Sequence, residues 1–179
     1  KIMLTLVIVL ILINWVQAFT PPLDYDVLEY HLGAPAEYFK NGKVFFLENN
    51  VYANFPQNME MIAYFYMELC HSKFSGAFCS QLTLWVYGIL LIPAVYMMAQ
   101  LFLPKEEAWL SAFFAYSLPW TSELLRVYYV EVPFTIALIA SLFLLLDSHQ
   151  QTKNKFFLIG LFLGIASGIK YTGLFIGAI

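Results

Sequence analysis

The chain has 179 residues, of which 61% are hydrophobic and 12% charged, and its formal net charge is −3. An average soluble domain is about 45–50% apolar and about 25% charged, so this composition indicates a membrane protein. Binding of nucleic acid would require clustered Lys and Arg, which the sequence lacks. We therefore expect membrane lipid, and no nucleic acid, among its partners.

Strongly apolar segments predict an all-α fold, a polytopic transmembrane helical bundle. Residues 2–19 rise about 1.5 Å each as a helix and nearly cover a hydrocarbon core of about 30 Å, and Pro21 stops this helix. The third segment is short, ends at Pro119 and is followed by a polar break at residues 121–123. The expected spans are about 2–19, 74–103, 108–119, 130–146 and 156–179.

A long polar and aromatic loop, residues 20–73, separates the first two predicted spans. Apolar residues recur at spacings of one, three and four over residues 27–39, which predicts an amphipathic helix on the membrane surface that is closed by Asn41 and Gly42. Pro56 opens a second helix at about 57–69, which is too short to cross a bilayer. Both helices are therefore expected to be interfacial.

The order of the spans predicts which polar segments share a side of the membrane. The short basic loop at residues 148–155 suits the cytoplasm. Two crossings separate the first loop from residues 123–131, so these two segments are expected on the same, external face. The chain begins at Lys1 without an initiator Met and ends in an apolar run at Ile179, so we expect it to be the N-terminal part of a larger protein.

Ionisable side chains gather directly after the first predicted span, at Asp24, Asp26, Glu29 and His31. Such groups at a membrane boundary either stay solvated or are held for proton transfer, metal binding or headgroup recognition. We interpret the loop as one wall of an active site.

Simpler roles for these charged residues are open at this level. Asp26 is well placed to cap the helix that begins after it, and Asp24 is expected in solvent or in a turn. His31 could form a hydrogen bond within the loop, since no second His stands at metal-ligand spacing. Arg126 could extend its side chain to the membrane interface, or pair with Glu123 or with Glu131. Lys170 could mark a helix end near headgroups. Two cysteines, Cys70 and Cys79, could form a disulfide or remain unpaired thiols.

Several motifs together resemble the GT-C superfamily of membrane glycosyltransferases, which includes protein O-mannosyltransferases and lipid A aminoarabinose transferases. DYDVLEYHLGAP, YFKNG, NVYANFP and NMEMI are similar to the first external loop of these enzymes, with Asp26 at the position of a loop aspartate. RVYYVE, from Arg126 to Glu131, has the spacing of an Arg and an acid at the mouth of a later helix, and GIASGIKYTGL is similar to a Lys-Tyr-Thr helix ending in bacterial members. Two departures stand out: Val27 replaces a Glu of the protein O-mannosyltransferases, and Glu131 replaces a more usual Asp.

The resemblance implies a transferase of the bacterial cytoplasmic membrane with its active site facing outside. It would transfer a hexosyl or pentosyl group, with inversion, from a polyprenyl-phosphate sugar to a lipid, glycan or protein. Asp26 is the candidate catalytic base. The candidate substrate-binding residues are Arg126, Glu131, Tyr30, His31, Lys170 and Glu60, of which Arg126 or Lys170 would hold the phosphate. A divalent metal ion is left open, with Asp26 and Glu131 as its ligands.

Two other functions are consistent with an apolar helical chain. A transporter fragment would line a substrate path with intramembrane charges, and an assembly subunit would carry out no chemistry. Transporters place polar groups in the middle of broken spans, whereas the polar groups here gather at one mouth and in one loop. This distribution favours the transferase.

Overall fold

The computed structural model describes residues 2–147 and 153–177, and in this part of the chain every regular element is helical. The elements are α1 (Ile2–Gln17), η1 (Val27–His31), α2 (Gly33–Asn41), η2 (Tyr52–Asn54), α3 (Asn58–Cys70), α4 (Lys73–Ala99), α5 (Lys105–Ser117), α6 (Pro119–Arg126), α7 (Glu131–Leu146), α8 (Lys153–Ile169) and α9 (Thr172–Gly177). The predicted all-α class is confirmed.

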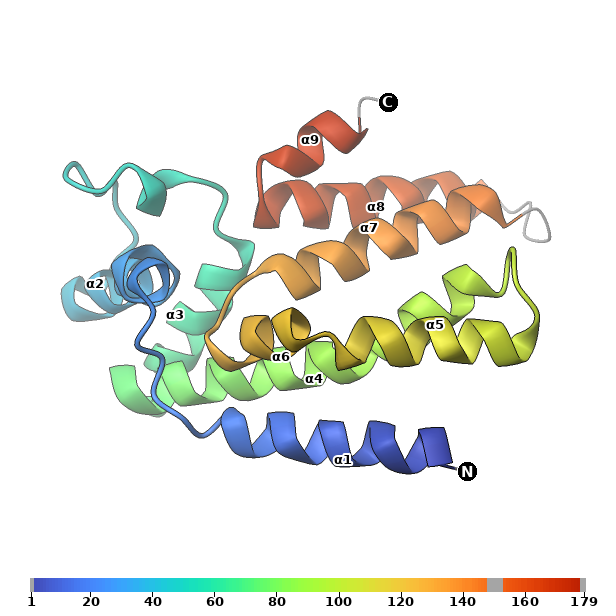
Figure 1. The fold of residues 1–179 in the computed structure, drawn as a ribbon. Coiled ribbons are helices and arrows are strands. Elements are labelled where there is room, and N and C mark those ends of the chain that lie inside the picture. Colours follow the sequence, from blue (N-terminus) through green and yellow to red (C-terminus); the bar gives the residue numbers. More distant parts are fainter. Residues whose placement is uncertain (1, 148–152, 178–179) are drawn as a thin grey trace.

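The long helices run side by side, and the first loop is folded over one end of them (Figure 1). Helix α4 packs against α5 and α7, and α7 packs against α8. The connections from α1 to α4, from α6 to α7 and from α8 to α9 lie toward the end on the left of Figure 1, which we call the loop end. The turn between α4 and α5 lies at the opposite end. The loop and residues 127–131 therefore lie together, as the alternation of spans predicts.

Among the described helices, α4 is long and apolar enough to cross a membrane by itself. Helices α6 and α7 meet the same criterion only as a pair, and they are bent by 115° relative to each other. Met3–Gln17 and Asn154–Ile169 are apolar but shorter. Five spans and two interfacial helices therefore stay a prediction.

The predicted polar break after the third span is helical. Pro119 occupies the first turn of α6, a position where its missing N–H is not needed. The hydroxyl of Ser122 lies within hydrogen-bonding distance of the side-chain oxygens of Asn14 and Gln17 on α1. The polar side chains at the end of α1 thus have partners on α6.

The range 156–179 does not form one continuous helix. Helix α8 ends at Ile169, and α9 turns back over α8 (Figure 1). The break exposes Lys170 and Tyr171 at the loop end. Residues 148–152 of the predicted cytoplasmic loop lie outside the described residues.

The predicted interfacial helix at 27–39 is divided in two. A π-helical turn, η1, precedes α2, and a Cβ at Gly33 would lie 2.3 Å from the carbonyl oxygen of Leu28. Only glycine fits at that junction. Asn41 ends α2 as expected, with Gly42 in a left-handed conformation at φ 64°. The second predicted loop helix, 57–69, is α3, displaced by one residue.

Close packing fixes α3 against α4. A Cβ added at the buried Gly76 would lie 2.5 Å from the backbone nitrogen of Met67. The side chain of Gln81, also on α4, donates hydrogen bonds to the carbonyl oxygens of Thr20 and Arg126, at 3.1 and 2.8 Å. Helix α4 therefore holds the start of the loop and the end of α6.

We expect Gly76→Ala to lower the free energy of unfolding by about 1–3 kcal/mol, because the new methyl group overlaps the backbone of α3. Gly160→Ala is the matched control, since a Cβ at this helical glycine meets nothing within 4 Å. The control should leave stability unchanged or raise it by up to about 1 kcal/mol. Thermal unfolding of both variants in detergent measures the difference, and equal midpoints would contradict this packing.

Candidate active site

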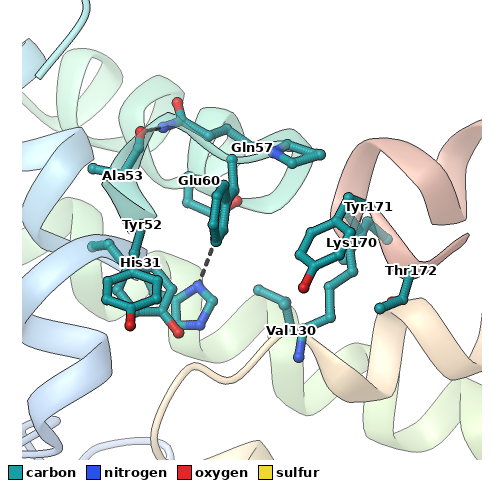
Figure 2. Close-up of a pocket in the computed structure, with 13 residues that line it drawn as sticks. His31, Tyr52, Ala53, Gln57, Glu60, Val130, Lys170, Tyr171 and Thr172 are labelled. Carbon is teal, nitrogen blue, oxygen red and sulfur yellow. Dashed lines mark hydrogen bonds and ion pairs between the residues drawn. The ribbon is translucent and has the colours of Figure 1, made fainter. Parts of the chain in front are cut away.

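A pocket with a volume of about 210 Å³ lies at the loop end, between the first loop and the junction of α8 and α9 (Figure 2). The loop side and α3 contribute His31, Tyr52 and Glu60, and the opposite side contributes Lys170, Tyr171 and Thr172. Val130 lies on the floor of this view, from the segment between α6 and α7. Three separate parts of the sequence thus form one pocket. The remaining lining residues are Tyr30, Ala53, Phe55, Pro56, Gln57 and Ile169.

His31 and Glu60 form a buried pair in this pocket. Nδ1 of His31 lies 2.5 Å from Oε1 of Glu60, and the two residues are 3% and 4% exposed. A carboxylate and an imidazole buried together avoid the cost of leaving either polar group alone. The structure thus supports the hydrogen-bonding role considered for His31, and its partner is Glu60 on α3.

Lys170 faces the pocket and is bound to Glu131. Its Nζ lies 2.5 Å from Oε1 of Glu131, and the side chains are 37% and 34% exposed. The other carboxylate oxygen of Glu131 is buried without a hydrogen-bond partner among the described residues. The break between α8 and α9 carries the lysine, and the first turn of α7 carries the glutamate. This ion pair therefore links the start of α7 to the junction of α8 and α9.

Asp26 and Glu131 both lie within electrostatic reach of Tyr30. Burial, followed by the negative charges of Asp26 and Glu131, raises the pKa of Tyr30 to about 12. Asp26 precedes η1 but its side chain forms no capping hydrogen bond, so the simple capping role is not observed. Its carboxylate stays available to other groups, although Asp26 does not itself line the pocket.

Asp24 is not the free solvated residue that the sequence suggested. Its Oδ1 accepts a hydrogen bond of 2.6 Å from the hydroxyl of Tyr129. Burial and this bond to Asp24 raise the pKa of the Tyr129 phenol. The ring of Tyr129 in turn meets the His31 ring edge-on, with centroids 5.8 Å apart. Asp24 thus supports the wall that carries His31.

Arg126 is bound to Glu123, three residues earlier on α6, through both Nε and Nη2. Glu131, the acid at the motif spacing, binds Lys170 instead. Arg126 interacts electrostatically with Asp24, but it does not line the pocket. Of the two cations considered for phosphate binding, Lys170 is the one at the pocket.

A divalent metal ion held by Asp26 and Glu131 stays a prediction. No group of three or more His, Cys, Asp or Glu side chains in this part of the chain could hold one. The ammonium group of Lys170 already occupies Oε1 of Glu131.

Some pocket residues were not among the sequence candidates. Tyr52, Tyr171 and Thr172 line it, and Tyr129 supports it from behind. The rings of Tyr52 and Tyr30 stack with centroids 5.7 Å apart. Tyr171 and Thr172 stand in the same GIASGIKYTGL motif as Lys170, so a helix break recognised there would have indicated them.

A family model for dolichyl-phosphate-mannose-protein mannosyltransferases matches residues 59–179. The chain is therefore a member of this family of GT-C-type membrane glycosyltransferases. The match contains Glu60, Arg126, Glu131 and Lys170, whereas Asp26, Tyr30 and His31 precede it. Searches of curated proteins and of solved structures gave no match.

The placement of Asp26 can be tested without an activity assay. The phenol of Tyr30 should ionise at about pH 12, against about 10 in an unfolded chain. Its contribution to stability is therefore complete below about pH 10 and is lost as the pH rises toward 12. Asp26→Asn removes one of the charges that disfavour phenolate, so it should lower the pKa of Tyr30.

The measurement is an ultraviolet titration in which the spectrum of a Tyr30→Phe protein is subtracted. Glu37→Gln is the control, because the exposed Glu37 does not contribute to the shift at Tyr30. An unchanged Tyr30 titration in Asp26→Asn would show that Asp26 lies elsewhere.

Proposed function

We propose that the protein transfers a sugar from a polyprenyl-phosphate donor to a lipid, glycan or protein acceptor at the external membrane face. The observation that carries this proposal is the position of Lys170, which faces the pocket across from His31 and Glu60 at the end of an apolar bundle. A donor with an isoprenoid tail keeps that tail in lipid while its phosphate and sugar lie at the boundary. The pocket at the loop end offers a cation, Lys170, and the polar pair of His31 and Glu60 to such a headgroup.

The chemistry requires a cation and a base. The sugar is joined through C1 to phosphate, and the phosphate leaves with its negative charge as the acceptor oxygen attacks C1. Lys170 would bind that phosphate and stabilise the charge that develops, as placed cations do in phosphate-leaving reactions. Glu131, at 2.5 Å, holds the ammonium group in position. Attack on the face of C1 opposite the phosphate gives inversion.

Asp26 is the proposed base that takes the proton of the acceptor hydroxyl. Two observations support this role. The carboxylate is not used as a helix cap, and it lies close enough to the pocket residue Tyr30 to affect its ionisation. An acid near Tyr30 would meet an acceptor that arrives from outside, while Lys170, at the break between α8 and α9, would hold the donor phosphate.

Asp26→Asn should lower sugar transfer by roughly two to four orders of magnitude, the range for a positioned general base, because the amide cannot accept the proton. Folding should be unaffected, since the side-chain size is kept and no capping bond is lost. Asp24→Asn is the matched control: an amide oxygen can still accept the hydrogen bond of Tyr129, so transfer should fall much less. The assay follows labelled acceptor with the full-length protein in membranes.

Near-normal transfer by the Asp26→Asn protein would remove the base assignment. A larger loss in Asp24→Asn than in Asp26→Asn would move the role to Asp24. Loss of both proteins from the membrane fraction would point to a structural role for this part of the loop.

A further inference from the structure

The buried pair of His31 and Glu60 has a feature that the proposed transfer chemistry does not use. Glu60 accepts a hydrogen bond at Oε1, so an ionised Glu60 requires the proton of His31 to be on Nδ1. A neutral imidazole in that tautomer has an unprotonated Nε2, which is a hydrogen-bond acceptor. Among the described residues, the hydrogen bond of the His31 ring is made at Nδ1, and His31 lines the pocket. Nε2 is thus the atom through which the pair can reach a ligand.

The surroundings of His31 suit a sugar ring. The pocket volume of about 210 Å³ is below the range of about 300–1,000 Å³ for drug-sized ligands, so it suits one small group. Tyr52 and Tyr171 supply aromatic walls, and Lys170 stands on the side opposite His31 (Figure 2). A phosphate bound to Lys170 would direct its attached sugar toward His31.

We propose that this pocket binds the sugar of the donor, and that His31 accepts a hydrogen bond from one of its hydroxyl groups. Glu60 acts as a positioning residue that fixes the tautomer of His31. The inference rests on the proposed function, because it takes the donor to be a lipid-linked sugar phosphate. The inference adds His31 as a specificity-determining residue. Together with Glu60, His31 would distinguish a lipid phosphate that carries a sugar from one that does not.

Binding to the purified full-length protein tests this proposal without any transfer reaction. The probes are undecaprenyl phosphate and the same lipid phosphate carrying mannose, glucose or galactose. His31→Phe keeps an aromatic ring but removes the acceptor, so it should weaken binding of the preferred sugar lipid about tenfold. Binding of undecaprenyl phosphate should not change. The sugar-dependent gain is the ratio by which the sugar lipid binds more tightly than undecaprenyl phosphate. Glu60→Gln should reduce this gain, whereas Lys170→Gln should weaken the binding of both lipids equally.

Glu68→Gln, on α3 but outside the pocket, is the control and should bind like the wild type. If His31→Phe fails to bind either lipid, Tyr52→Leu replaces it, because the exposed Tyr52 lines the same wall. That variant should also lose the sugar-dependent gain selectively.

The proposal is overturned if the wild type binds no sugar lipid more tightly than plain undecaprenyl phosphate, or if the variants keep the wild-type ratio. A transfer defect in Asp26→Asn with an unchanged sugar ratio in His31→Phe would reject this inference and keep the proposed function.

A second, independent feature is the contact between two thiols at the junction of α3 and α4. The Sγ atoms of Cys70 and Cys79 lie 3.9 Å apart, and both residues are half-buried. Cys70 ends α3, and Cys79 lies near the start of α4. We infer that the two form an intramolecular disulfide by exchange with a disulfide oxidant. One thiolate attacks the oxidant and releases its first thiol, and the second thiolate then displaces the other, so two protein thiols become one disulfide.

Oxidised glutathione and the purified full-length protein suffice to test this pairing. The wild type should lose two hydrogen atoms in mass and give a linked peptide containing Cys70 and Cys79. Cys79→Ser should instead stop at one glutathione adduct on Cys70. Two separate adducts on the wild type, or two unreacted thiols, would overturn the inference.

Discussion

The pairing of His31 with Glu60 is the interaction on which the site depends. A buried acid and imidazole stabilise the fold only when they meet, so this pair fixes η1 against α3. Helix α3 is held on α4 by the close approach at Gly76. The hydroxyl of the buried Tyr128 adds a bond of 2.9 Å to the carbonyl oxygen of Met59, which ties the segment before α7 to the start of α3. Three separate chain segments are thereby assembled into one wall.

Irregular backbone at the loop end places the side chains that matter. Helix η1 is a π-helical turn, Tyr128 has a positive φ of 61°, and α8 stops before Lys170. Such departures from regular geometry are frequent at functional sites, where neighbouring structure holds them in place. In an apolar bundle, a break is tolerated where its polar groups find partners or line a cavity. Here the breaks surround one pocket and supply it with Tyr30, Val130 and Lys170.

Composition and hydropathy were sufficient for the helical class and for the positions of most helices, because long apolar runs leave few alternatives. Of the residues singled out from the sequence, Tyr30, His31, Glu60 and Lys170 line the pocket, whereas Asp26, Arg126 and Glu131 do not. The sequence did not reveal which charges pair. Arg126 binds Glu123 because α6 is helical and brings residues three apart together, whereas the sequence suggested a break there. The partnership of Lys170 and Glu131 depends on the end of α8, which hydropathy cannot locate inside a continuous apolar run.

Photo-crosslinking tests most directly the central claim that the loop, α3 and the junction of α8 and α9 enclose the donor headgroup. The probe is a polyprenyl-phosphate sugar with a photoreactive group on the sugar, applied to the full-length protein in membranes. The account predicts labelled peptides that contain residues 52–60 and 169–172, with labelling reduced by excess unmodified donor. Competed labelling confined to the apolar surface of α1, around residues 9–17, would contradict it.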